Sequence, residues 1–167
     1  MSYSINILVP NAVEPIYPTF PSSIILKNEI DDEFFKRYSD IWPFFSSITG
    51  IVYSLVQEMF EEYYGSFPLC ESDFECCLGK ERLPFELSED ARENLTTFLV
   101  KAEYFEDFIM LIHFLLVTSP NKKIMFHTRY EGGDTEIILG VIKWDKFVNM
   151  LKEKQIYFNI CYIVSLT

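Results

Sequence analysis

The sequence predicts an α+β protein with a single domain, residues 1–167. A helical middle is flanked by strands near both chain ends, which form a mainly antiparallel sheet. Three observations predict this class: alternating apolar residues near the N-terminus, apolar residues every three or four positions in the middle, and short β-type runs after residue 122. At 167 residues and 49% hydrophobic composition, the chain can bury a core without disulfides or a metal.

The N-terminal region predicts two strands and a helix. Apolar residues alternate over Tyr3–Val9, which predicts a strand, and the prolines between residues 10 and 21 enforce an extended linker. Ser23–Lys27 is a candidate second strand. From Asp31 the pattern becomes helical, with acids in the first turn, and Pro43 ends this helix.

A second helix is predicted from Pro43 to Tyr64, ending at Gly65. Its buried stripe recurs at three and four residues: Phe44, Ile48, Ile51, Val52, Leu55, Met59 and Tyr63. Gly50 within it permits close packing. The segment Ser66–Leu87 has no clean period, so it is predicted to be a long irregular loop of the kind that often carries function.

A third long helix is predicted from Ser88 to Val117, with a break near Ala102. Its core side is marked by Phe98, Ala102, Phe105, Ile109, Ile112 and Leu116. Phe108, Leu111 and Leu115 widen this stripe so far that the C-terminal half should be covered on most faces.

The remaining sequence returns to β-type patterns. Lys123–Arg129 and Thr135–Ile142 are predicted strands, joined as a hairpin around Gly132-Gly133-Asp134. Asp145 is predicted to cap a short helix through Lys154 that buries Phe147, Val148 and Leu151. Gln155–Leu166 is the predicted final strand.

Residues for catalysis or metal binding are sparse, and we predict no enzyme, no cofactor and no metal site. Phosphate-binding glycine loops, nucleophile elbows and helical zinc motifs are missing from the sequence. Both histidines, His113 and His127, lie in apolar settings that predict core or strand residues. The four cysteines, Cys70, Cys76, Cys77 and Cys161, lack zinc-ligand spacing and are predicted to be reduced thiols.

Neither export nor membrane insertion is predicted, so we expect a cytoplasmic protein. No Lys or Arg precedes Lys27, and Ile5–Val9 is too short for a signal-peptide core. The longest apolar stretch, Phe108–Val117, is about half the length that a bilayer requires.

The acidic charge is confined to the first 117 residues. That part holds 20 acids and 7 bases, a net charge of −13, whereas residues 118–167 hold 5 acids and 7 bases, a net charge of +2. Such a field attracts a basic partner from a distance. We therefore expect a positively charged protein as partner, rather than a nucleic acid or a membrane.

Three acid and aromatic clusters are the candidate contact surfaces. The end of the helix predicted over 43–64 carries glutamates where the helix dipole disfavours negative charge, the 66–87 loop adds a second cluster, and the following helix adds a third. These candidate partner-binding residues are Glu58, Glu61, Glu62, Tyr64, Asp73, Phe74, Glu75, Glu103, Tyr104, Glu106 and Asp107. Carboxylates bind arginines, and the aromatic residues supply anchors.

These clusters, together with the passage from Ile138 to Phe147, give the chain its family resemblance. It resembles the immunity proteins of bacterial toxin systems, including those of contact-dependent growth inhibition. The resemblance implies a stoichiometric inhibitor that binds the C-terminal toxin domain of a secreted effector, often a basic nuclease. The inhibitor's carboxylates would replace nucleic-acid phosphates against the toxin's lysines and arginines.

Two other functions fit the sequence. An acidic mimic of DNA would inhibit a nucleic-acid enzyme, but it needs carboxylates spaced like phosphates along an extended surface, whereas the acids here are clustered. A carboxylate-dependent hydrolase would place two acids at one cleft, formed around the 66–87 segment.

Overall fold

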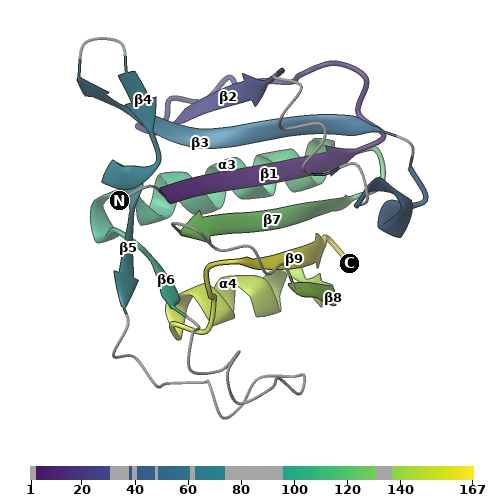
Figure 1. Cartoon of the computed structure of the whole chain (residues 1–167). Coiled ribbons are helices and arrows are strands. Elements are labelled where there is room, and N and C mark those ends of the chain that lie inside the picture. Colours follow the sequence, from purple (N-terminus) through teal and green to yellow (C-terminus); the bar gives the residue numbers. More distant parts are fainter. Residues whose placement is uncertain are drawn as a thin grey trace.

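A central sheet joins the N-terminal and C-terminal parts of the chain (Figure 1). The computed structural model describes residues 3–30, 38, 41–47, 49–60, 63–73, 96–130 and 137–167. The sheet has the strand order β2-β3-β1-β7-β9-β8, with β4 paired to β3. These strands are β1 (Tyr3–Pro10), β2 (Ile25–Glu29), β3 (Gly50–Phe60), β4 (Tyr63–Gly65), β7 (Lys123–Tyr130), β8 (Ile137–Lys143) and β9 (Ile160–Ser165). Their pairings are antiparallel apart from β8 with β9, which confirms the predicted α+β class and its mainly antiparallel sheet.

A second, two-stranded sheet and the helices complete the described chain. The small sheet pairs β5 (Cys70–Asp73) with β6 (Thr97–Val100). The α-helices are α3 (Phe105–Thr118) and α4 (Trp144–Lys152), and the 3-10 helices are η1 (Trp42–Phe45), η2 (Phe67–Leu69) and η4 (Ala102–Tyr104). Figure 1 shows α3 and α4 on the same side of the main sheet.

The sheet buries side chains on both faces because successive residues of a strand point in opposite directions. On β1, Ile5 and Ile7 join a core cluster with α3 and α4, whereas Leu8 joins a cluster with η1. On β7, Phe126 faces the helices and Met125 faces η1. We call these the helix face and the η1 face of the sheet.

The helix predicted from Pro43 to Tyr64 is wrong. The chain forms η1 and then the strands β3 and β4. Strand β3 contributes Tyr53 and Leu55 to the core of the helix face and Val52 to that of the η1 face, so Val52–Val56 is an unbroken buried run. Such a run loses the alternation that distinguishes a strand from a buried helix. Gly50 does allow a close approach, because a Cβ there would lie 2.3 Å from the carbonyl oxygen of Val9.

The region from residue 66 to residue 117 is partly corrected. Cys70–Asp73 is a strand within the predicted loop, and Thr97–Val100 is a strand within the predicted helix. Each strand satisfies its backbone groups with a partner that local sequence periodicity does not reveal. After this strand, helical structure begins with η4 at Ala102, close to the expected break, and α3 ends at Thr118. The parts of these predictions at residues 74–95 lie outside the described residues, as does the helix predicted from Asp31.

The predicted hairpin between the two strands after residue 122 is wrong. Both strands exist, but β9 lies between β7 and β8. Because α4 returns the chain to the starting end of the sheet, β8 and β9 run parallel, as a helical crossover requires. Helix α4 buries Phe147, Met150 and Leu151, while Val148 is half-buried. Asp145 lies in its first turn but is not the cap, which is Lys143.

The two histidines have different environments. His127 is fully buried on β7, as predicted, and its Nδ1 lies 2.8 Å from the Tyr38 hydroxyl. His113 was predicted to be a core residue but is exposed, with its ring 5.3 Å from that of Trp144, because it falls on the outward stripe of α3. In the part of the chain that the structure describes, no helix combines the length and apolar character needed to cross a membrane.

Candidate functional site

The ends of β3 and β4 carry a group of exposed apolar side chains. Met59, Phe60, Tyr63 and Tyr64 are exposed by 37%, 64%, 58% and 43%. The rings of Phe60 and Tyr63 stack at 5.2 Å with an interplanar angle of 14°. With Glu58, these residues define the hairpin tip. Large apolar side chains gathered at a projecting point are typical of protein interaction surfaces.

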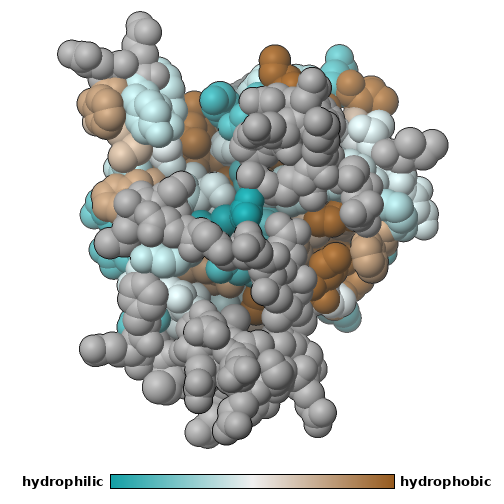
Figure 2. Space-filling model, viewed as in Figure 1, coloured by the Kyte–Doolittle hydropathy of each residue, from teal (hydrophilic) through white to brown (hydrophobic). Residues whose placement is uncertain are grey.

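The strand pairing places two predicted contact residues together at the hairpin tip. Glu58 on β3 is the register partner of Tyr64 on β4, and the pairing shifts between Glu58 and Phe60. A bulge of this kind increases local twist and turns the end of a hairpin away from its sheet. Figure 1 shows this end projecting at the upper left, and Figure 2 shows tan and pale side chains at the same corner.

A polar anchor fixes the segment that follows β4. The buried hydroxyl of Ser66 donates to the carbonyl oxygen of Leu55 at 2.7 Å and accepts the backbone N–H of Ile5 at 3.2 Å. The next residue, Phe67, is 44% exposed, and its ring lies 5.9 Å from the Lys101 ammonium. Phe67 therefore connects the hairpin tip to the groove that contains Lys101.

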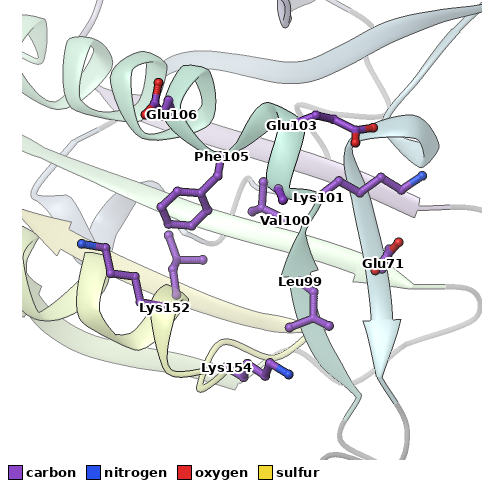
Figure 3. A pocket seen from close by; sticks show the side chains of 11 residues that line it. Glu71, Leu99, Val100, Lys101, Glu103, Phe105, Glu106, Lys152 and Lys154 are labelled. Carbon is purple, nitrogen blue, oxygen red and sulfur yellow. The ribbon is translucent and has the colours of Figure 1, made fainter.

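That groove is a cavity of about 790 Å³ between the small sheet, the start of α3 and the end of α4 (Figure 3). Its apolar wall includes Leu99, Val100, Phe105 and Leu151. Three carboxylates and three ammonium groups also line it: Glu71, Glu103, Glu106, Lys101, Lys152 and Lys154. We call it the charged groove.

The charges of the groove are mixed because the fold brings lysines from the C-terminal part beside the acids of α3. Figure 3 shows Glu71, Lys101 and Glu103 at the small-sheet end, with Lys152 and Lys154 on the α4 side. No salt bridge joins these six described side chains to one another. An apolar wall with both signs of charge around it suits a polypeptide, which offers carboxylates, ammonium groups and apolar side chains together.

The predicted cluster on η4 and the start of α3 divides between contact and structural positions. Glu103 and Glu106 are exposed at the groove, whereas Tyr104 is half-buried and packs against the core. Asp107 accepts hydrogen bonds from the hydroxyl and the backbone N–H of Ser23, which lower the pKa of this carboxyl. Asp107 therefore holds the segment before β2 against α3.

The other predicted contact residues fall in two groups. Asp73 is half-buried at the end of β5. Glu61, Glu62, Phe74 and Glu75 lie outside the described residues.

Sequence reasoning missed five residues of this region as contact candidates: Phe60, Phe67, Lys101, Lys152 and Lys154. Met59 and Tyr63 were placed in a buried helical stripe, but both are exposed. Alternation counted from buried Val56 would have placed Glu58 and Phe60 on one side of a strand and Met59 on the other.

The site offers little to a metal ion. Among the described residues, no three His, Cys, Asp or Glu side chains are grouped so that they could hold one. Cys70, beside Glu71, is buried, and this burial raises the pKa of its thiol to about 12. A thiol that stays protonated near neutral pH is a poor nucleophile and a poor ligand.

Comparisons with protein-family models, with curated proteins and with solved structures gave no match to the chain.

Proposed function

We propose that this protein is an immunity protein that binds and neutralises a cognate toxin domain, a basic nuclease, as a stoichiometric inhibitor in the bacterial cytoplasm. The observation that supports it best is the exposure of four large apolar side chains at the hairpin tip beside Glu58. Aromatic anchors supply much of the binding energy in protein interfaces, and surrounding carboxylates select a cationic partner.

The charged groove favours a protein partner over the DNA-mimic alternative. A mimic of DNA needs a row of negative charges that resembles phosphates. Lys101, Lys152 and Lys154 interrupt such a row, because they line the same cavity as the carboxylates. Separate charges of both signs instead fix the orientation of a folded partner.

We expect a secreted effector to be encoded immediately upstream of this chain, and the direct test uses its toxin domain. The domain is expressed in a bacterial host with and without this protein, and survival and the binding constant are measured. We expect protection and a complex of one to one stoichiometry. A host that dies equally with and without the chain, together with no binding of the purified proteins, contradicts the proposal.

Variants of the hairpin tip locate the contact. Replacing Phe60 or Tyr64 with alanine should weaken binding about 30-fold or more, as expected for an interface anchor. Tyr17→Ala is the matched control, because Tyr17 is 51% exposed but lies in the linker between β1 and β2. Equal effects of Tyr64→Ala and Tyr17→Ala would remove the hairpin tip from the proposal.

The electrostatic part has its own test. Reversal of Glu58, Glu61 and Glu62 to Lys should slow association and reduce its dependence on salt, while dissociation changes less. Stopped-flow association at low and high ionic strength measures both. An unchanged association rate at low salt excludes these acids from steering.

The hydrolase alternative is supported by one observation, that Glu71, Glu103 and Glu106 line one groove. Titration calorimetry with Mg²⁺ or Mn²⁺ on the wild type and on Glu71→Gln separates the two functions. An inhibitor should bind neither ion specifically, whereas saturable binding that is lost in Glu71→Gln would favour the hydrolase.

A further inference from the structure

The outward side of α3 carries an apolar stripe. Phe108, Leu111, Ile112, Leu115 and Leu116 face the sheet and are buried. Between Asp107 and the end of the helix there is no Asp, Glu, Lys or Arg, so the opposite side carries apolar residues around a single histidine. Met110 is 45% exposed and Val117 is 39% exposed, and His113 is exposed between them. The prediction that this half of the helix is covered on most faces is therefore wrong for its outward side.

This outward stripe has the spacing of a helix-packing seam. Glu106, Met110, His113 and Val117 follow one another at intervals of four, three and four residues, which places them in one row. A row of this spacing on one helix packs against a similar row on another helix. We call these four residues the α3 ridge.

The α3 ridge has hollows on both sides. One, of about 320 Å³, lies toward α4 and is lined by Phe105, Glu106, Ile109, Met110, Val148 and Lys152. The other, of about 300 Å³, is lined by Phe20, Met110, His113, Phe114 and Val117. Met110 borders both hollows, so the surface offers a projecting side chain and the recesses to receive one.

Charges of opposite sign mark the two ends of the α3 ridge. Glu106 and Glu103 lie at the N-terminal end. At the C-terminal end, the Lys122 ammonium donates a hydrogen bond to the carbonyl oxygen of Val117. A parallel copy of this helix would set like charges together. An antiparallel copy sets Glu106 of each helix against the Lys122 end of the other.

A two-fold axis between two copies of α3 would place each Met110 opposite a hollow and each acidic end opposite a basic end. In a symmetric dimer the same surface is used twice, so it must contain a projection and its recess and must carry complementary charges across the axis. The α3 ridge meets both conditions. Its centre falls between Met110 and His113, which would pack against His113 and Met110 of the other copy.

We propose that a second copy of this chain docks on the α3 ridge, with the two α3 helices antiparallel and each Met110 seated in a hollow of the other copy. This interface is separate from the hairpin tip, and it goes beyond the proposed function. A dimer of this kind leaves both tips available to partners.

Sedimentation equilibrium of the purified chain, from micromolar to millimolar concentration, tests the proposal. We expect a monomer–dimer equilibrium, and Met110→Glu should raise its dissociation constant at least about tenfold, because it places a charge in the hollow that Phe20, Phe114 and Val117 of the other copy line. Met59→Glu is the matched control, because Met59 is 37% exposed on the hairpin tip, and it should leave the equilibrium unchanged.

Charge exchange tests the antiparallel orientation. Glu106→Lys and Lys122→Glu should each weaken the dimer, and the double variant should restore it. Failure of the double variant to recover affinity overturns the antiparallel arrangement. A monomer at every concentration overturns the whole proposal, and so does a Met110→Glu variant that loses toxin affinity while its mass distribution stays the same.

Discussion

The two faces of the main sheet are held by different forces. The helix face contains a group of touching aromatic rings, in which Phe126 lies 5.7 Å from Phe98, 5.9 Å from Phe108 and 5.2 Å from Phe147. The η1 face also has an apolar cluster, but it contains a buried hydrogen-bonded group as well. Apolar packing is non-directional and gives most of the stability, whereas buried hydrogen bonds require one arrangement.

The polar group of the η1 face runs across three neighbouring strands. The Ser54 hydroxyl donates to Asn6 Oδ1 at 2.9 Å, and Asn6 Nδ2 donates to the Tyr38 hydroxyl at 3.0 Å, which also contacts His127. Asn6 is the register partner of both Ser54 and His127. A slip of one residue would turn these groups toward the apolar helix face, so the difference between the faces fixes the register of β3, β1 and β7.

The largest expected effect is on the helix face. Phe126→Ala removes the ring that three other rings contact and should lower the free energy of unfolding by about 3–5 kcal/mol. Urea denaturation measures it. The control is Met125→Leu, at the adjacent buried position on the η1 face, which should cost less than about 1.5 kcal/mol. A loss below about 1 kcal/mol for Phe126→Ala would show that the aromatic group does not dominate stability.

A smaller effect with a distinct signature is expected on the η1 face. Asn6→Ala removes two buried hydrogen bonds and should cost about 1–3 kcal/mol. Because Asn6 and Tyr38 share a bond, the losses from Asn6→Ala and Tyr38→Phe should not add in a double-mutant cycle. Ile7→Val, on the neighbouring residue that faces the helices, should combine additively with Tyr38→Phe. Additive losses for the Asn6 and Tyr38 pair would argue against a coupled polar group.

The smallest expected effect appears only at alkaline pH. Burial raises the pKa of the Cys70 thiol on the helix face from about 9 to about 12. The folded state therefore keeps a proton that the unfolded state releases, so this part of the stability is complete below pH 9 and is lost as the pH rises toward 12. The stability that is lost by pH 10 through this thiol is about 1 kcal/mol.

Unfolding of the wild type and of Cys70→Ala between pH 8 and pH 10 measures that contribution. The variant should lose less stability than the wild type over this range, whatever its stability at neutral pH. Parallel pH profiles for the two proteins would contradict it.

The sequence predicted those elements whose pattern is local. Helix α3 repeats its apolar residues over more than three turns, and β1 alternates Ile5, Ile7 and Val9 with other residues, so both were found. Strand β3 was not, because Val52–Val56 is apolar or small at every position and also satisfies helical spacing. Its identity is decided by β1 and β2 on its two sides, which are separated from it in sequence.

The candidate site was predicted in composition but not in geometry. Glu58 and Tyr64 were named for the end of a helix, yet they meet as partners across two strands. Glu103 and Glu106 were named as an acidic surface, but Lys152 at the end of α4 and Lys154 just after it share their groove. Contacts between distant segments depend on strand order, which local sequence periodicity does not encode.

The placement of β9 has a consequence for the order of folding. This strand follows β8 in the chain but lies between β7 and β8. Until β9 is in place, β7 and β8 are not bridged, and the sequence Gly132-Gly133-Asp134 between them favours a direct, incorrect pairing. The chain therefore depends on α4 folding early enough to carry β9 into the gap.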